Sequence, residues 1–243
     1  MKIGIITDIH SNTQALKVVL EKFDKEKVDK IICCGDIVGI GIDPENAVQE
    51  LIKRKDKLIA VRGNHEQYIF KGLPKEVHDD KRALKQEEID YHNWNHSKLS
   101  NESIDFLREF PISQNIEICG KKIYIVHYPL KEDGKYKKHI KNPTLEDCKE
   151  LFNNIDADIY LFGHTHTYCE HQDAEKWYIN VGSLGCPLNT NLAKAGIIEI
   201  IDGKIKFESI NIEYNVQQLI EEIKKIKNPF YKSILKTFYG TKI

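Results

Sequence analysis

The sequence lacks the long apolar runs that mark membrane proteins. No stretch approaches the roughly 20 apolar residues that a membrane-spanning helix needs. The first residues, MKIGIITD, have the pattern of a β-strand, and no charged segment leads into a long apolar run with a small-residue cleavage site. We therefore expect no membrane association and a cytoplasmic location.

The sequence also lacks an excess of charge of either sign. Its 36 Lys and Arg residues almost balance 37 Asp and Glu residues, which gives a formal net charge of -1 at pH 7. Proteins that hold long nucleic acid non-specifically usually carry a basic field, so this balance disfavours long DNA or RNA as a partner. A small basic groove would not alter the total, and a nuclease therefore stays an alternative.

Cysteine pairs with metal-ligand spacing are absent as well. Six cysteines are scattered through 243 residues, and none forms a CxxC motif. Cys33 and Cys34 are adjacent within an apolar run, so a strand would point them to opposite faces and bury both thiols. This use of cysteine suits a reducing cytoplasm and disfavours a thiol as the catalyst.

The chain does contain a series of short runs rich in Ile and Val that alternate with helical patterns. Helices are expected at 13–23 and 45–53, and the turn Asp202-Gly203 should join the last two runs into a hairpin. Early alternation and a late hairpin predict an α/β fold with mixed rather than purely parallel sheets. The expected strands are 2–7, 30–34, 57–61, 123–127, 159–162, 177–181, 195–201 and 205–212.

Two segments depart from this strand pattern, although the length suits a single domain, 1–243. Segment 67–111 is polar and mostly helical, and we interpret it as a helical cap inserted into the domain; Ser100 should be the N-cap of one of its helices. Segment 213–243 is a helical tail. Its apolar face packs either on the core or on a second copy of the chain, so a homodimer stays open.

Polar motifs follow five of the expected strands at their carboxyl ends. Open α/β sheets bind ligands in the crevice beyond these ends, so the motifs predict one shared site. Each motif alone is weak evidence, whereas their order and joint presence are specific. The motifs are Asp8-Ile9-His10, Gly35-Asp36, Gly63-Asn64-His65-Glu66, His127 and Gly163-His164-Thr165-His166.

In this order the motifs resemble the calcineurin-like metallophosphoesterase superfamily, whose pattern is D-x-H, G-D, G-N-H-D/E, H and G-H-x-H. The resemblance covers residues 1 to about 190 and implies a two-sheet αββα sandwich with mixed β-sheets. Glu66 stands where many small members carry Asp, and Glu also occurs in the protein-phosphatase branch. The D-R-G sequence of that branch is missing after Asp36, and the surrounding stretches look like small prokaryotic phosphoesterases.

The resemblance implies two metal ions that share one carboxylate. Asp36 would bridge both ions, and His65 would stand beside them without binding either. The ligands of the first ion would be Asp8, His10, Asp36 and His166. The ligands of the second would be Asp36, Asn64, His127 and His164.

The donor types indicate which metals fit. Imidazole and carboxylate ligands suit Mn, Fe, Zn or Ni better than Mg or Ca, and we favour Mn or Fe. Two such ions about 3.5–4 Å apart clamp an in-line displacement at phosphorus, with a bridging hydroxide as the nucleophile. His65 would then protonate or polarise the leaving oxygen.

Two further residues are candidates for binding substrate. The amide of Asn12 could reach a phosphate oxygen, or its side chain could cap the helix that begins at Thr13. Arg62 could clamp a phosphoryl group, or it could form an ion pair with a nearby carboxylate.

The expected partner is a small phosphorylated substrate, either a nucleotide-type phosphodiester or a dinucleoside polyphosphate. A phosphomonoesterase with the same site is an alternative. A non-catalytic interaction module is disfavoured, because all ligand positions are present. The cap histidines either contact a phosphate or lie at the surface; they are His78, His92 and His96.

Overall fold

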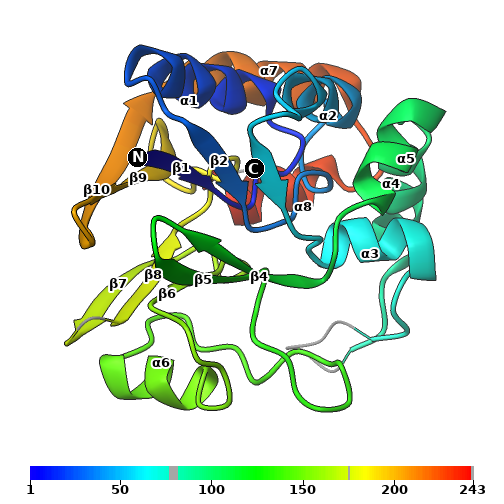
Figure 1. Cartoon of the computed structure of the whole chain (residues 1–243). Helices are drawn as coiled ribbons and strands as arrows, with labels where there is room; N and C mark the ends of the chain where they lie inside the picture. Colours follow the sequence, from blue (N-terminus) through cyan, green and yellow to red (C-terminus); the bar gives the residue numbers. More distant parts are fainter. Residues whose placement is uncertain (77–81, 175, 242–243) are drawn as a thin grey trace.

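Two mixed β-sheets form the centre of the structure, a computed structural model that describes residues 1–76, 82–174 and 176–241 (Figure 1). The strand order is β10-β9-β1-β2-β3 in the first sheet and β4-β5-β6-β8-β7 in the second. The first sheet consists of β1 (Lys2–Ile6), β2 (Lys30–Cys33), β3 (Leu58–Ala60), β9 (Leu192–Ile201) and β10 (Lys204–Glu213). The second consists of β4 (Ser113–Ile118), β5 (Lys121–Val126), β6 (Ile159–Leu161), β7 (Tyr168–Asp173) and β8 (Lys176–Val181).

Each sheet has parallel pairs that carry the motifs and antiparallel pairs at its margins. Strands β1, β2 and β3 are parallel, and so are β5, β6 and β8. Strand β9 joins β1 antiparallel, and β4 and β7 are antiparallel edge strands of the second sheet. The mixed-sheet α/β prediction is therefore confirmed.

Helices cover the outer faces of both sheets, which gives the αββα layering (Figure 1). Three of them lie over the first sheet, α1 (Thr13–Lys25), α2 (Pro44–Ile52) and α7 (Val216–Ile226). Helix α6 (Leu145–Leu151) lies over the second sheet. The remaining helices are α3 (Asn64–Lys71), α4 (Gln86–His96), α5 (Asn101–Arg108) and α8 (Tyr231–Phe238). Ile234 and Leu235 of α8 belong to the same buried cluster as side chains of α1, α2 and α7.

Alternating strand residues build separate cores inside and outside the sandwich. Ile5 and Ile125 belong to a buried cluster between the sheets, whereas Ile6 packs in the outer cluster with α1 and α2. The period of two along a strand produces this division. Cys33 lies in the outer cluster and Cys34 in the inner one, both fully buried, as the adjacent thiols predicted.

Local signals for turns and caps agree with the structure. The Ser100 side chain accepts a hydrogen bond from the backbone of Ser103 and caps α5. Asp202 and Gly203 have φ angles of 49° and 74°, the left-handed pair that a two-residue hairpin needs. Apolar side chains of α7 and α8 are buried within the chain, which supports the alternative in which the tail packs on the core.

Strands β4 and β7 were not predicted from the sequence. Their sequences, SQNIEI and YCEHQD, contain many polar residues, and apart from the buried Cys169 their positions are half-buried or exposed. An edge strand is covered on fewer sides than a central one, so its side chains need less hydrophobic character and the apolar signal is weak.

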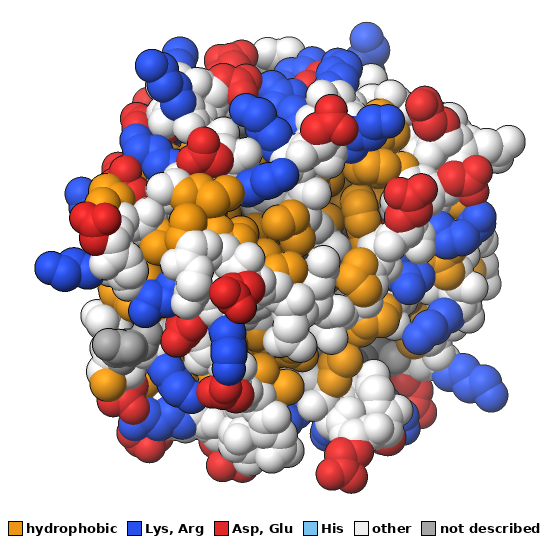
Figure 2. Space-filling model, viewed as in Figure 1, with side chains coloured by type: hydrophobic (Ala, Val, Ile, Leu, Met, Phe, Trp, Pro, Cys, Tyr) orange, Lys and Arg blue, Asp and Glu red, His pale blue; other side chains and the backbone are white. Residues whose placement is uncertain are grey.

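Two general expectations can be compared with the surface and the helices. On the face in Figure 2, basic and acidic side chains are interspersed without a large region of one sign, which agrees with the balanced composition. Among the described residues, no helix is both long enough and apolar enough to cross a bilayer.

Packing between the sheets predicts the effect of a core truncation. Replacing Ile125, which is 0% exposed, by Ala should lower the free energy of unfolding by about 2–5 kcal/mol, because a cavity remains between the sheets. Ile201→Ala is the control, since Ile201 is 55% exposed, and it should change the value far less. Urea denaturation in the presence of a chelator measures both. Equal effects would contradict this account of the core.

Candidate metal centre

The five motifs meet at one edge of the sandwich. Each follows a strand, namely β1, β2, β3, β5 or β6; four lie in loops, whereas Asn64, His65 and Glu66 form the first turn of α3. The structure brings all seven predicted ligand side chains together there, in two groups that share Asp36. Three of them, Asp8, His10 and His127, are at most 1% exposed, and Asp36 is 2% exposed.

The first group surrounds one carboxylate oxygen of Asp8. His10 Nε2 lies 2.8 Å from His166 Nε2, and these nitrogens lie 3.6 and 3.3 Å from Asp8 Oδ1. The other oxygen, Asp8 Oδ2, accepts a hydrogen bond from the Thr7 hydroxyl and the shorter branch, 3.0 against 3.2 Å, of a bond from the backbone N–H of His164 that both oxygens share. These bonds orient the carboxylate so that Oδ1 faces the two histidines.

The second group is joined to the first through one oxygen of Asp36. His127 Nε2 lies 3.1 Å from Asp36 Oδ2, which is also 3.9 Å from His10 Nε2. His164 Nδ1 lies 3.1 Å from His127 Nε2 and 2.9 Å from Asn64 Oδ1. Asp36 Oδ1 instead accepts the backbone N–H of His65, so Oδ2 alone stands between the groups.

These donor sets fit divalent metal ions. His127 Nδ1 lies 2.8 Å from the backbone oxygen of Cys34, so it carries the proton when the ring is neutral and Nε2 presents a lone pair. This lone pair points to the same place as the Asp36 carboxylate and the Asn64 amide oxygen. The three donors repel one another, and a bound cation would offset that repulsion. Metal bonds of about 2.0–2.2 Å place ligands of one shell roughly 3–3.5 Å apart, close to the observed spacings.

The loops that carry the ligands have unusual backbone conformations. Five of the ligands have positive φ angles, between 48° and 72°, in a region that residues other than glycine seldom adopt. Such conformations persist only where surrounding contacts enforce them, and they are typical of functional sites. The five residues are Asp8, His10, Asp36, His164 and His166.

Motif glycines make room for the carboxylates. A Cβ atom on Gly63 would lie 2.1 Å from Asp36 Oδ1, and a Cβ atom on Gly163 would lie 2.6 Å from Asp8 Oδ2. Both distances are far inside van der Waals contact. The glycines therefore allow the backbone of one motif to approach the carboxylate of another.

The Glu66 carboxylate ties two of the motif loops together. Its Oε2 accepts the backbone N–H groups of Asp36 and Gly63, and its Oε1 accepts those of Ile37 and Val38, at 2.8–3.0 Å. Burial and the nearby Asp36 charge raise the pKa of Glu66 to about 7, while the N–H groups act in the opposite direction. Glu66 holds the loops rather than facing the ligand groups.

Charge pairing shifts the pKa values of the ligands in opposite directions. Burial opposes the charged forms, but the mutual attraction between Asp36 and His127 outweighs it. The pKa of Asp36 is held far below its usual range, and the pKa of His127 is raised to about 9. Asp8, beside His166, also has a lowered pKa. Without metal, a proton on His127 therefore balances the carboxylate charge.

His65 lies beside the ligand groups, and one of its possible ligand atoms lies within 4.8 Å of those of His10 and Asp36. Its ring centroid is 5.1 Å from that of His10, and its buried Nδ1 has no hydrogen-bond partner in the described part of the chain. Burial, with repulsion from neighbouring histidines, lowers the pKa of His65 well below 6.5 despite the Asp36 charge. Bound cations would lower it further, so the neutral ring is the relevant form.

The two predicted substrate-binding residues differ in their contacts. The Asn12 side chain accepts the backbone N–H of Ala15 and donates to Gly185 and Tyr214, which is the helix-cap alternative and leaves its amide no free hydrogen. The Arg62 guanidinium lies 5.4 Å from the Phe70 ring centroid. Among the described residues, Arg62 forms no ion pair, so its predicted carboxylate partner was wrong.

The cap histidines differ from one another. His92 is buried and lies 5.3 Å from the His65 ring, so the prediction of a surface residue was wrong for it. Burial lowers the pKa of both His92 and His96 to about 4. His78 lies outside the described residues. Helix α4 folds back over the motif loops, and this tertiary contact is what places His92 near the site.

Two residues near the ligands were not expected. His139 Nδ1 lies 3.2 Å from His164 Nε2, and the Cys186 sulfur lies close to His10 and His166. His139 follows a polar loop without a motif, so no sequence signal marked it. Cys186 lies outside the five motifs, so no sequence signal marked the thiol either.

Comparisons with known proteins agree with this geometry. The model of the calcineurin-like phosphoesterase superfamily domain matches residues 1–203. The uncharacterized protein MJ0912 of Methanocaldococcus jannaschii is 29% identical over 93% of each chain. Phosphodiesterase YfcE of Escherichia coli K12 is 24% identical over 82% of this chain and 88% of its own. The crystal structure of the hypothetical protein PH1004 from Pyrococcus horikoshii has a TM-score of 0.81 at 20% identity, covering 100% and 99% of the chains.

The Glu66 contacts predict a large effect of a nearly isosteric substitution. Each carboxylate oxygen of Glu66 accepts two backbone N–H groups. Glu66→Gln replaces one of the oxygens by an NH2 group, so two backbone N–H groups lose their acceptor. The free energy of unfolding should fall by about 2–5 kcal/mol, measured by urea denaturation. The exposed Glu208→Gln is the matched control and should stay within about 0.5 kcal/mol of the wild type. An unchanged free energy of unfolding in Glu66→Gln would show that Glu66 does not hold the two loops together.

The raised pKa of His127 predicts that metal binding releases protons. Below about pH 9 the chelator-treated protein carries a proton on His127, which a metal ion must displace. Metal affinity should therefore rise with pH and level off above about 9. Calorimetric titration with Mn²⁺ at pH 7.5, in buffers of different ionisation enthalpy, measures the release. Binding heats that do not depend on the buffer would contradict the pairing of Asp36 with His127.

Proposed function

The chain belongs to the calcineurin-like phosphoesterase superfamily and is a metal-dependent phosphoesterase, and we propose that it hydrolyses small phosphodiesters with two divalent metal ions. The observation that carries the proposal is the sharing of Asp36 Oδ2 by two groups of ligand side chains. In this proposal, one ion is held by Asp8, His10, Asp36 and His166. The other is held by Asp36, Asn64, His127 and His164.

The chemistry of the donors supports transition metals. The seven side chains supply four imidazoles, two carboxylates and one amide oxygen, a mixture that suits Mn or Fe, with Zn and Ni as alternatives. Bound there, two divalent ions supply Lewis acidity, which activates water and stabilises charge at the phosphoryl group. The six free thiols also fit the cytoplasmic location that we propose.

His65 is the proposed catalytic residue outside the ligand set. Its backbone N–H is bonded to Asp36 Oδ1, which ties its position to the shared ligand. A buried, neutral imidazole can donate a hydrogen bond from one ring nitrogen to an oxygen of the substrate. Because the ring stays neutral, we favour polarisation of the leaving oxygen over full protonation by His65.

A cavity of about 360 Å³ adjoins the proposed ligands and supports a small substrate. This volume is at the lower end of the range for small-molecule sites. Asn64, His65 and His164 line it beside the centre, and His92 of α4 lines it further out. His92 Nδ1 is buried without a hydrogen-bond partner, so we propose that it contacts the substrate.

The other wall of the cavity comes from the C-terminal tail. Helix α8 contributes Ile234 and Phe238 to this wall, and Phe230 precedes the helix. Ile40 and Leu84 also line the cavity. An apolar wall beside a phosphoryl site suits a diester whose second substituent is apolar or aromatic, such as a nucleoside base. The α8 part of this wall lies beyond residue 203, where the superfamily match ends.

A substrate screen tests the reaction class. With Mn²⁺ present, the protein should hydrolyse bis(p-nitrophenyl) phosphate faster than p-nitrophenyl phosphate, and chelation should abolish both activities. Cyclic nucleotides and dinucleoside polyphosphates belong in the same screen. Faster hydrolysis of the monoester would favour a phosphomonoesterase, and no hydrolysis of any ester by metal-loaded protein would favour a non-catalytic role.

Two substitutions separate metal binding from chemistry. Asp36→Asn should lower the affinity for both ions, because it weakens the shared ligand. His65→Gln should keep the metal content and lower kcat by about 10²–10⁴-fold. Metal analysis and steady-state kinetics on both variants provide the measurements. Loss of metal from His65→Gln would show that His65 is a ligand and that its proposed role is wrong.

A further inference from the structure

The imidazole ligands have two ring nitrogens, and in three of them the outer nitrogen has an assigned partner. His10 Nδ1 lies 3.3 Å from the backbone oxygen of Val38, and His127 Nδ1 lies 2.8 Å from that of Cys34. His164 Nε2 lies 3.2 Å from His139 Nδ1. Such partners orient the ring and decide which nitrogen faces the metal.

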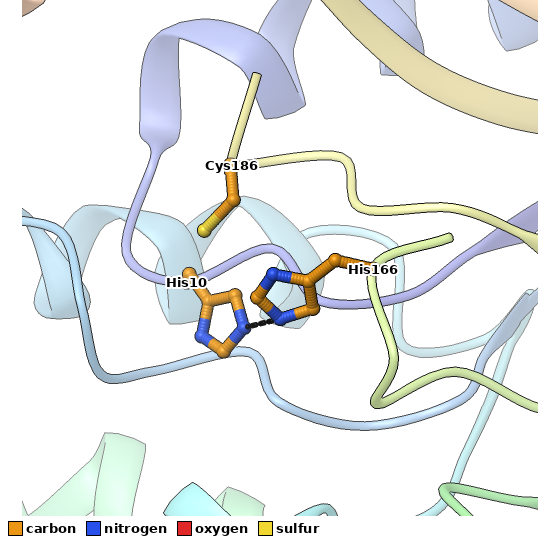
Figure 3. Close-up of side chains that lie close together, drawn as sticks. All are labelled: His10, His166 and Cys186. Atoms are coloured by element: carbon orange, nitrogen blue, oxygen red, sulfur yellow. Dashed lines mark hydrogen bonds between the residues drawn. The ribbon is translucent and has the colours of Figure 1, made fainter. Parts of the chain in front are cut away.

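The fourth imidazole, His166, has a sulfur atom in the corresponding place. Figure 3 shows the Cys186 sulfur facing the His166 nitrogen that is not bonded to His10. Because Nε2 is the nitrogen that pairs with His10, the nitrogen facing the sulfur is Nδ1. The Cys186 sulfur and one ring nitrogen of each of His10 and His166 lie within 4.8 Å of one another.

The position of Cys186 is set by the loop that carries Asp8. The backbone N–H of Cys186 donates to the Ser183 hydroxyl, which donates to the backbone oxygen of Asp8, both at 2.9 Å. The N–H of Gly185 donates to the same Asp8 oxygen. A Cβ atom on Gly185 would lie 1.8 Å from the backbone oxygen of Ile9, so the two segments are in direct contact. Cys186 itself is 4% exposed.

We propose that Cys186 is a positioning residue for the first metal ion: its sulfur accepts the Nδ1–H of His166 and thereby holds Nε2 toward the ion. The inference rests on the proposed two-metal function. The positions of Asp8 and Cys186 then depend on each other. The hydrogen bonds from Ser183 and Gly185 to the backbone oxygen of Asp8 hold the sulfur beside His166, which is a proposed ligand of the same ion as Asp8.

The direction of the sulfur supports a role through His166 rather than on the ion. The sulfur faces Nδ1, whereas the atoms that converge with Asp8 Oδ1 are the two Nε2 nitrogens. A thiol is a weak acceptor, and its low exposure keeps water from competing for the ring N–H.

Metal affinity provides the test, because it does not depend on turnover. Mn²⁺ affinities of the two sites are measured by competition with a chromophoric chelator. Cys186→Ala should lower the affinity for one of the two ions about 10- to 100-fold, as substitutions of residues that orient a ligand do. The affinity for the other ion should change far less. Cys186→Ser, which offers a hydroxyl oxygen as acceptor, should recover part of the loss. It also serves as the test variant if the alanine variant does not fold.

Two further variants distinguish positioning from a general effect of losing a buried thiol. Cys169→Ala is the matched control: Cys169 is 5% exposed, and its sulfur contacts Cys148 rather than a proposed ligand. It should leave both affinities unchanged. Adding Cys186→Ala to His166→Ala should weaken metal binding no further, because the sulfur acts through that ring.

The outcomes that overturn the inference are distinct from failure of the proposed function. Unchanged affinities in Cys186→Ala, or a loss equal to that in Cys169→Ala, would show that Cys186 does not position His166. The two-metal proposal would not be affected. A sulfur-to-metal charge-transfer band in Co²⁺-loaded wild type, lost in Cys186→Ser, would make the thiol a direct ligand and overturn positioning. Wild type that binds two ions but hydrolyses no ester would contradict only the proposed function.

Discussion

The Glu66 carboxylate makes the interaction on which the metal centre depends. It collects four backbone N–H groups from the loops after β2 and β3, the loops that present Asp36 and Asn64. These loops would otherwise expose unpaired N–H groups in a buried place, at a cost of about 1–3 kcal/mol each. Glu66 thus fixes the two loops relative to each other. The ligands that they carry then lie at set positions facing His127, His164 and His166, which follow strands of the second sheet.

That edge concentrates features that cost stability. Asp8 and Asp36 are buried carboxylates, and several ligands have left-handed backbone conformations. Strain and buried charge of this kind persist where function requires them. Divalent ions would offset the cost by mass action, because they bind the folded chain and find no such arrangement in the unfolded one. The sandwich therefore supplies the stability, and the loops at its edge supply the chemistry.

The motif residues could be predicted because each follows an apolar run, and parallel strands bring their carboxyl ends to one edge. The two edge strands, β4 and β7, were missed because their one-sided burial leaves a weak apolar signal. His92, His139 and Cys186 were missed for another reason. They reach the ligands through the packing of α4 and of two loops on the motif edge, and no local pattern reports such contacts. Asn12 carried two plausible roles, and its buried contacts identify the helix cap.

The central claim is that two ions share Asp36. Anomalous diffraction from crystals soaked in Mn²⁺ tests it most directly. Two anomalous peaks should lie about 3.5–4 Å apart, on either side of the Asp36 carboxylate. One should be enclosed by Asp8, His10 and His166, and the other by Asn64, His127 and His164. A single peak, or peaks that Asp36 does not contact, would contradict it.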